Sequence, residues 1–378
     1  MTNQDDLLPE GLEDRLPPEA KAAAAAMRDV LDVMDAHGYD RVSPPLVEFE
    51  KSLSGRMAGG NDGATARRMF RFVDPVSLRM LAVRSDMTPQ VGRIAATGLA
   101  GAARPLRMCY GGEVALIRAD QLDPARQRLQ IGAELIGSDT VAAAAEMVAL
   151  AIESLGRAGA TGISVDFTLP DLVDILSEKA MPLAPENIAQ VRRELDTKDA
   201  GGLAQVPGGE AYMPLLYATG PFDQAIARLR DIDAARGTGG GALASRIAGL
   251  TQIAERVAGS ARLTLDPTER HGFEYQSWFG FTIYADGVRG TVGRGGTYTI
   301  GGTNEPATGF SLYIDALVDA FESPPARDTL FLPLGHDRDV AARLRAIGWR
   351  TIEALADSDD AAALGCTHRL DGVDATAL

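Results

Sequence analysis

Two stretches in the first half of the chain constrain the fold most, because together they predict a pair of strands. Residues 106–115 and 128–137 are strand candidates, and the segment between them is polar, with Asp120, Asp123 and Arg126. Two strands joined by a loop without a helix favour antiparallel pairing. The sequence therefore predicts a fold that is built on an antiparallel sheet.

Helices are predicted on either side of this pair. Residues 17–37 begin with prolines and place apolar side chains at three- and four-residue spacings, and Gly38 follows where helices usually stop. Residues 41–48 predict an extended segment, because the residues before its two prolines are pushed away from helical geometry. Residues 140–155 are alanine-rich and predict another helix.

The character of the chain changes after residue 160. Residues 163–169 predict a short strand, and helical stretches follow it, with glycine-rich breaks at 201–202 and 238–241. Residues 161–260 are therefore expected to form a mainly helical insertion.

Antiparallel sheet is expected to resume after this insertion. Residues 273–284 alternate bulky side chains, and Asp286-Gly287 is a two-residue hairpin signal that leads into residues 288–292. Beyond a predicted linker at Ser323-Pro324-Pro325, the pattern is strand, helix, strand, over residues 330–334, 340–347 and 350–354.

Length and composition indicate a globular α+β protein with several packing units. The chain has 378 residues, of which 46% are hydrophobic and 24% charged. We expect a core of residues 1–160 and 261–322, the insertion, and a truncated C-terminal α/β segment of residues 326–378.

Charge restricts the partners of this chain. It has 37 Lys and Arg against 52 Asp and Glu, and a formal net charge of −15 repels a polyanion unless basic residues cluster on one face. Nucleic acid is therefore a disfavoured partner, although charge alone leaves a local basic groove open.

A cytoplasmic protein without a metal or cofactor is expected. No run approaches the roughly 20 apolar residues of a membrane-spanning helix, and residues 1–16 carry no targeting signal. Cys109 and Cys366 lie far apart without metal-ligand neighbours, so we expect two ordinary thiols in a reducing cytoplasm.

Asp86 and Thr88 form the first motif with binding chemistry, within residues 81–90. A carboxylate accepts charge-assisted hydrogen bonds and a hydroxyl orients a ligand, which suits an ammonium group. From the local sequence alone, the plainer interpretation is favoured, in which Asp86 or Thr88 caps a helix over residues 89–96.

The second motif is Gln130-Ile131-Gly132-Ala133-Glu134. Gln130, Gly132 and Glu134 share one face of the predicted strand, since side chains alternate with a period of two. An exposed sheet face explains Glu134 equally well from the pattern alone.

Two tyrosines and a group of glycines are the remaining candidates for residues of a binding site. Tyr275 and Tyr298 fit either plain core or the wall of a pocket. The glycines between residues 293 and 302 predict turns and close strand approaches rather than a phosphate loop, because no Lys-Ser pair and no immediate helix follow them.

Taken in order, these motifs resemble the catalytic core of histidyl-tRNA synthetase over residues 17 to about 320. Residues 43–48 are similar to the first motif of class II aminoacyl-tRNA synthetases, which forms a dimer interface in that family. The resemblance implies a class II synthetase-like antiparallel sheet flanked by helices. It also implies a histidine-binding site that is formed by Asp86, Thr88, Gln130, Glu134, His271, Tyr275 and Tyr298.

The departures from this pattern concern the cations that bind ATP. Gly111 stands where the second synthetase motif has an arginine, and Ala316 stands where the third motif has one. His271 replaces the arginine that opens the pocket signature, and either His271 or the neighbouring Arg270 is left to take the carboxylate of the ligand. Loss of one preorganised donor typically costs about 10² to 10³ in rate. The resemblance therefore implies a non-catalytic protein that keeps the histidine contacts.

One group of synthetase paralogues combines these losses, namely the regulatory subunits of ATP phosphoribosyltransferase. They work with a short-form catalytic subunit on the first step of histidine biosynthesis. The resemblance implies that subunit as partner, L-histidine as effector, and a dimer core within a hetero-oligomer. Residues 329–378 are about half the size of the synthetase anticodon-binding domain, which argues against tRNA recognition. A stand-alone synthetase-like binding protein and a functional histidyl-tRNA synthetase remain as alternatives.

Overall fold

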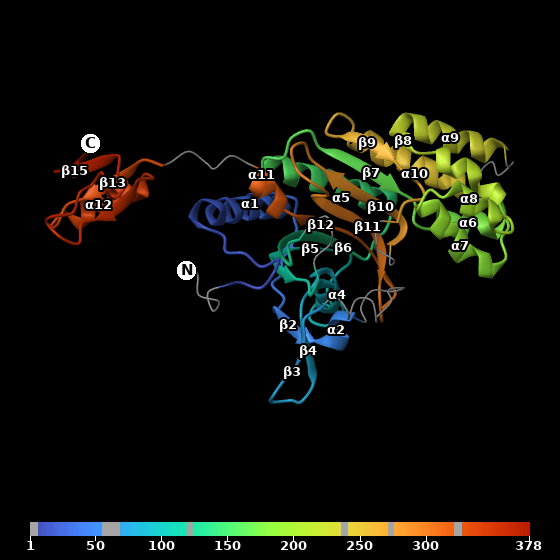
Figure 1. The fold of residues 1–378 in the computed structure, drawn as a ribbon, viewed down its shortest axis with the longest axis horizontal. Coiled ribbons are helices and arrows are strands. Elements are labelled where there is room, and N and C mark those ends of the chain that lie inside the picture. Colours follow the sequence, from blue (N-terminus) through green and yellow to red (C-terminus); the bar gives the residue numbers. More distant parts are fainter. Residues whose placement is uncertain (1–6, 55–68, 119–123, 236–240, 271–275, 321–326) are drawn as a thin grey trace. The chain divides into compact units, whose positions relative to one another are not determined.

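The computed structural model describes residues 7–54, 69–118, 124–235, 241–270, 276–320 and 327–378 (Figure 1). The chain divides into two compact units, residues 1–322 and residues 323–378. The first unit contains a large sheet and carries the candidate site.

The large sheet of the first unit has nine strands in the order β1-β5-β6-β12-β11-β10-β7-β9-β8. Neighbouring strands are antiparallel except that β1 runs parallel to β5 and β7 parallel to β9. The bounds are β1 (Asp40–Arg41), β5 (Leu106–Ala115), β6 (Gln127–Ile136), β7 (Ser164–Thr168), β8 (Gly220–Pro221), β9 (Arg262–Leu265), β10 (Gln276–Tyr284), β11 (Gly293–Ile300) and β12 (Glu305–Tyr313). The predicted antiparallel pair is confirmed as β5 and β6.

Helices cover one face of this sheet (Figure 1). The bounds are α1 (Pro17–Ala36), α5 (Val141–Arg157), α10 (Ala242–Arg256) and α11 (Asp315–Ala320). α1 packs on α5, β5 and β6, while α5 also contacts α10, β11 and β12. The shared core buries Met34 and Met147 together with Ile131 and Ala133 of β6.

The opposite face of β6 is covered by α4 (Thr88–Ala96). Val91 and Ala95 of α4 are buried in a second apolar cluster with Ile136 and Tyr298. Because side chains alternate along a strand, Ile131, Ala133 and Leu135 of β6 face the α1 side, while Gln130 and Glu134 face the α4 side together with Ile136.

A smaller three-stranded sheet extends from the first unit (Figure 1). Its order is β2 (Val47–Phe49), β4 (Met80–Val83), β3 (Arg71–Val73), with antiparallel pairing throughout, and α2 (Glu50–Ser54) follows β2. Large apolar side chains on this sheet and beside it are exposed, namely Leu46, Phe49, Phe72, Val73, Val76, Leu78 and Met80.

The segment between β7 and β9 is mainly helical, as predicted. It contains α6 (Leu172–Glu178), α7 (Pro185–Asp196), α8 (Ala200–Gln205), a 3-10 helix (Gly209–Tyr217), α9 (Phe222–Ala235) and α10. The predicted break at 201–202 is wrong, because both glycines lie inside α8, where Asp199 accepts the N–H of Gly202 at 2.8 Å. Most of the break predicted at 238–241 lies outside the described residues, and whether 161–260 forms a separate domain stays a prediction.

The two-residue hairpin predicted at Asp286-Gly287 is also wrong. Residues 285–292 connect β10 to β11 and form no strand. Gly287 and Gly290 both have a left-handed backbone, with φ of 77° and 81°, and the N–H of Asp286 donates to the carbonyl of Thr161 at 2.9 Å. The loop therefore contains two glycines in the left-handed conformation and is hydrogen-bonded to the segment before β7.

The second unit is a four-stranded sheet in the order β14-β13-β15-β16 with one helix. The bounds are β13 (Thr329–Leu332), α12 (Arg338–Ala346), β14 (Arg350–Glu353), β15 (His368–Asp371) and β16 (Asp374–Ala377). The predicted strand, helix and strand are confirmed, whereas β15 and β16 were not predicted. The predicted linker at 323–325 lies outside the described residues.

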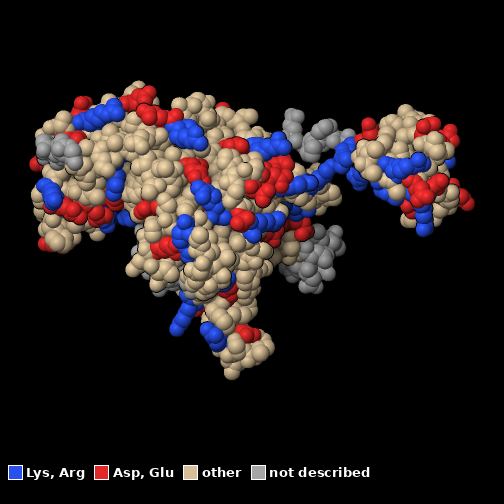
Figure 2. Space-filling view, turned by 180° about the vertical axis from the view of Figure 1, so that it is seen from behind, with Lys and Arg blue, Asp and Glu red and all other residues tan. Residues whose placement is uncertain are grey.

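Basic and acidic side chains are mixed on the surface. On the face of the first unit that Figure 2 shows, Lys and Arg lie among Asp and Glu and form no single basic patch. No helix within the described residues has both the length and the apolar character to cross a bilayer.

Candidate histidine site

Polar side chains from three adjacent strands meet on the sheet face that α4 covers. The register places Tyr110 of β5 and Ser311 of β12 opposite Gly132 of β6, between Gln130 and Glu134. Side chains directly opposite in an antiparallel pair share a face. Gln130 and Glu134 are almost fully buried, with exposures of 0% and 1%. This burial excludes the interpretation of Glu134 as an exposed sheet residue.

Asp86 and Thr88 reach the same place from the start of α4. The amide of Gln130 donates to Asp86 Oδ1 at 2.7 Å, and its carbonyl oxygen accepts the N–H of Met87 at 2.9 Å. Asp86 Oδ1 also accepts the N–H of Thr88 at 3.0 Å. The N-cap itself is Met87, which makes no side-chain cap bond. Asp86 therefore fixes the turn before α4 and faces the site with the same carboxylate.

Glu134 is held by two tyrosines. Tyr110 donates to Oε1 at 3.0 Å, and Tyr298 of β11 donates to Oε2 at 2.7 Å. Burial raises the pKa of Glu134 to about 8; the hydrogen bonds from the tyrosines oppose this rise, and the negative charge of Asp86 adds to it. Glu134 therefore carries a proton at neutral pH.

Ser311 connects the hydrogen bonds around Gln130 with those around Glu134. Its hydroxyl accepts from Gln130 at 2.7 Å and lies 3.1 Å from the phenol of Tyr110, which also lies 3.1 Å from the hydroxyl of Thr88. A continuous buried network thus runs from Asp86 to Tyr298. Tyr110 and Ser311 were missed in the sequence, because their place depends on the pairing of strands that are far apart along the chain.

The segment before β2 holds α4 in position. Gln90 donates to the carbonyl of Pro45 at 2.7 Å and to Glu48 at 3.0 Å, while Arg93 forms two hydrogen bonds with Glu48, at 2.6 and 3.0 Å. Arg84, largely buried, donates to the carbonyl of Pro44 at 3.0 Å. These contacts fix the helix end that presents Thr88.

Glycines form the floor of the site beyond Glu134. The residues directly opposite Glu134 on successive strands are Gly309 of β12, Gly296 of β11 and Gly280 of β10. A Cβ on Gly296 would lie 2.9 Å from Gln276 Nε2, and one on Gly309 would overlap the carboxyl of Glu134. These positions confirm the predicted close strand approaches.

The cavity above this floor is small. Its volume is about 20 Å³, and its walls include Thr88, Glu134, Gln276, Arg294, Tyr298 and Ser311. A water molecule needs a cavity of roughly 10–15 Å³. As the described residues enclose it, the cavity has room for about one water molecule.

The structure corrects the interpretation of Gly111. A Cβ at this position would lie 3.5 Å from both Leu31 and Met27 of α1. It points to the face opposite the site, so an arginine there would enter the apolar layer under α1. The site-facing neighbour is Gly112, whose Cβ would overlap the guanidinium of Arg84.

The remaining predicted residues have different outcomes. His271 and Tyr275 lie outside the described residues. Ala316 is half-buried in α11. Arg270 lies near α7, because its backbone N–H donates to Asp196 at 2.8 Å. Burial lowers the pKa of Arg192, and the positive charge of Arg270 lowers it further.

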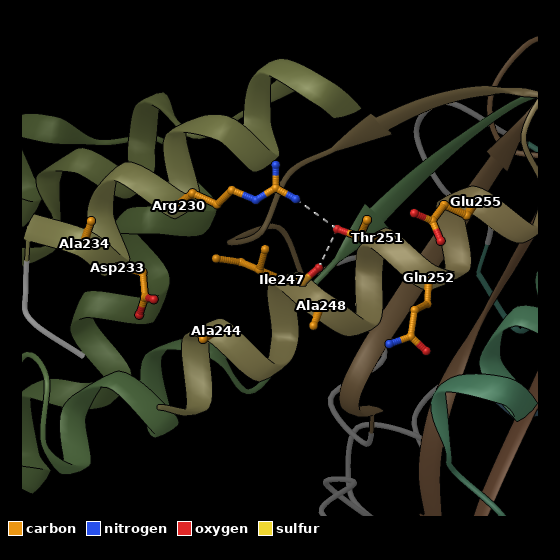
Figure 3. Close-up of a pocket in the computed structure, with 9 residues that line it drawn as sticks. All are labelled: Arg230, Asp233, Ala234, Ala244, Ile247, Ala248, Thr251, Gln252 and Glu255. Atoms are coloured by element: carbon orange, nitrogen blue, oxygen red, sulfur yellow. Dashed lines mark hydrogen bonds between the residues drawn. The ribbon is translucent and has the colours of Figure 1, made fainter. Parts of the chain in front are cut away.

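A larger depression lies between α9 and α10, away from these residues. Its volume is about 600 Å³, and Arg230 reaches across it to Thr251, whose hydroxyl donates to the carbonyl of Ile247 at 2.8 Å (Figure 3). None of the predicted site residues that the structure describes lines this groove. Among the described residues, no cluster of three or more His, Cys, Asp or Glu side chains is arranged to hold a metal ion.

The fold and this buried face define a class II histidyl-tRNA synthetase-like protein. The sequence model of the family described as histidyl-tRNA synthetase matches residues 11–317. A structure from Bacillus halodurans, titled ATP phosphoribosyltransferase regulatory subunit/histidyl-tRNA synthetase, superposes with a TM-score of 0.77 at 23% identity and covers 97% of both chains. Histidyl-tRNA synthetase from Nostoc has the same TM-score, 0.77, at 15% identity over 98% of this chain and 91% of that one.

Relatives in sequence identify a family within this class of proteins. The protein named ATP phosphoribosyltransferase regulatory subunit in Rhodospirillum centenum is 41% identical over 96% of this chain and 94% of its own. The protein of the same name in Paramagnetospirillum magneticum is 40% identical over 97% of both chains. The chain belongs to the family of ATP phosphoribosyltransferase regulatory subunits.

Proposed function

We propose that this chain activates a short-form ATP phosphoribosyltransferase, has no catalytic activity of its own, and makes the complex sensitive to inhibition by histidine. The proposal rests on one observation above all, namely the buried network of Asp86, Gln130 and Glu134. Buried carboxyl and amide groups are costly unless they are paired. A site that keeps them together suits a small ligand with an ammonium group and ring N–H donors, such as histidine, the end product of the pathway that the transferase begins.

Each end of histidine has a partner in the proposed complex. Asp86, Thr88 and Gln130 take the ammonium group, and Glu134 takes the imidazole ring. Tyr298 forms one wall of the ring pocket, and His271 and Tyr275 complete the proposed site.

Binding in this site requires a change of conformation. The cavity of about 20 Å³ is too small for an amino acid, so the proposed ligand stabilises a different arrangement of the lining side chains. A ligand shifts an equilibrium only through its different affinities for the two states. An effector role for histidine requires such a difference in affinity between two states of the complex.

The proposed absence of synthetase chemistry rests on Ala316 and His271. Gly111 does not contribute, because it faces away from the site. An arginine contact to a phosphate contributes roughly 1.5–3 kcal/mol, and such contacts act in the transition state. Neither the alanine nor the histidine at these positions supplies a guanidinium group in their place. Without these contacts the chain binds histidine and does not activate it.

The proposed assembly is a cytoplasmic hetero-oligomer around a dimer of this chain, with no nucleic acid or membrane partner. The dimer uses the helix and extended segment of residues 17–48, with β2 at its end. Exposed Leu46 and Phe49 support this, since they lie at β2, the edge strand of the three-stranded sheet within the described residues.

Reconstitution with a purified short-form transferase tests this function. We expect transferase activity to rise with added chain and to saturate at a fixed stoichiometry, and histidine to inhibit only the complex. Full activity and full histidine inhibition of the transferase alone would disprove the proposal.

A further inference from the structure

Arg294 lies on the same sheet face as the buried network. It stands on β11, opposite Ser311 of β12 and opposite Thr282 of β10. Ser311 in turn lies opposite Gly132 and contacts Tyr110. Since residues opposite one another share a face, Arg294 belongs to the row of side chains that borders the glycine floor.

Among the described side chains that line the cavity, Arg294 is the cation. The carboxyl groups lie at the other end, on β6 and at the start of α4. β11 lies two strands away from β6, and strands are about 4.8 Å apart, so roughly 10 Å separates the two ends across the floor. The floor between them consists of glycines, and the side chain of Gln276 lies over two of them, Gly280 and Gly296.

The ligand of the proposed site has opposite charges at neighbouring atoms. An α-amino acid brings a carboxylate together with its ammonium group, and that carboxylate needs a cationic partner when it leaves water. A guanidinium group presents a planar pair of N–H donors that matches a carboxylate. Arg270, the alternative in the sequence, has its backbone N–H bonded to Asp196 of α7 and is not among the described lining residues.

We propose that Arg294 binds the α-carboxylate of the effector and thereby makes the site selective for an amino acid over an imidazole amine. This inference rests on the proposed function, because it presupposes histidine at this site. Arg294 acts here as a specificity-determining residue, and no chemical step depends on it.

The test compares histidine with histamine, which has the same ring and amine but no carboxylate. Calorimetry would measure both ligands on the parent chain, Arg294→Met and Arg294→Lys, with histamine also measured by its displacement of histidine. Arg294→Met is expected to weaken histidine binding roughly 10- to 100-fold, the effect of one charge-assisted contact, and to change histamine binding less than about threefold. Arg294→Lys should retain part of the histidine affinity.

Arg157→Met is the matched control, since it removes the same charge from the exposed end of α5 and should leave both affinities unchanged. Unchanged histidine affinity in Arg294→Met would overturn the assignment, and so would an equal loss of histamine and histidine binding, which indicates a structural role. A parent chain that binds no histidine would instead overturn the proposed function itself.

Discussion

Tyr298 on β11 donates a hydrogen bond of 2.7 Å to Glu134 on β6, across the intervening strand β12. The bond crosses that strand because Gly309, which lies opposite Glu134 on β12, has no side chain to block it. Together with Tyr110, this contact holds a buried carboxyl group with a pKa of about 8. The proton on this group gives the site its first testable property.

The affinity for histidine is expected to be greatest between about pH 6.5 and pH 8. In this range the free ligand has a neutral imidazole, since its pKa is about 6.5, and Glu134 still carries a proton because its pKa is about 8. Transfer of that proton to the ring forms an ion pair without net proton exchange. Above pH 8 neither group carries the proton, so formation of the ion pair takes one up from solution. Below pH 6.5 both groups are protonated, so formation of the ion pair releases one. The affinity for histidine therefore falls in both directions, by up to about tenfold per pH unit.

Calorimetry from pH 5.5 to pH 9 checks this profile, with Glu134→Gln as the reference because it cannot titrate. Titration of the ligand's ammonium group changes the affinity of both proteins by the same factor. Above pH 8 the histidine affinity of the parent should therefore fall more steeply than that of the variant. Parallel plots of affinity against pH would exclude a titrating Glu134.

An arginine at position 111 is expected to damage the fold and to restore no chemistry. Its side chain would be forced against Met27 and Leu31, and overpacking of this kind typically costs about 1–3 kcal/mol. Denaturant unfolding of Gly111→Arg should show this loss, whereas Ala316→Arg, on a half-buried helix position, should change stability less. Pyrophosphate exchange into ATP in the presence of histidine, if it appeared in Gly111→Arg, would contradict the orientation that the structure gives to Gly111.

The chain is expected to be a dimer in solution. Leu46, which is 52% exposed in the single chain, lies in the proposed interface beside β2. Leu46→Asp should lower the sedimentation coefficient to that of a monomer at micromolar concentration. Leu355→Asp, at a 91% exposed position in the second unit, is the control and should leave the dimer intact. A parent chain that sediments as a monomer, alone and with the catalytic subunit, would refute the dimer.

Local sequence patterns predicted the elements that build the site. The strands β5 and β6 and the helices α1, α4 and α5 follow from periodicity and from prolines and glycines at their ends. The alternation along β6 also predicted that Gln130 and Glu134 share a face. Such features depend on residues a few positions apart.

The features that escaped prediction depend on strand register. Tyr110, Ser311 and Arg294 enter the site because β5, β12 and β11 align in one row with Gly132. The same register turns Gly111 away from the site, which comparison of motifs alone did not reveal. In the second unit, β15 (His-Arg-Leu-Asp) and β16 (Asp-Ala-Thr-Ala) lack the apolar run that marks β13 (Thr-Leu-Phe-Leu), although the three strands have the same length.

The central claim is that histidine acts through Asp86 and Glu134 of this chain. The most direct measurement combines calorimetry of histidine with inhibition of the reconstituted transferase, for the parent and for the double variant Asp86→Asn, Glu134→Gln. Both binding and inhibition should weaken together by at least roughly tenfold, with uninhibited activity nearly unchanged, because neither residue performs chemistry. Glu153→Gln, on the exposed side of α5, is the matched control and should behave like the parent. A double variant that binds histidine as tightly as the parent would contradict the site, and one that binds poorly yet remains fully inhibited would place the effector site on another surface of the complex.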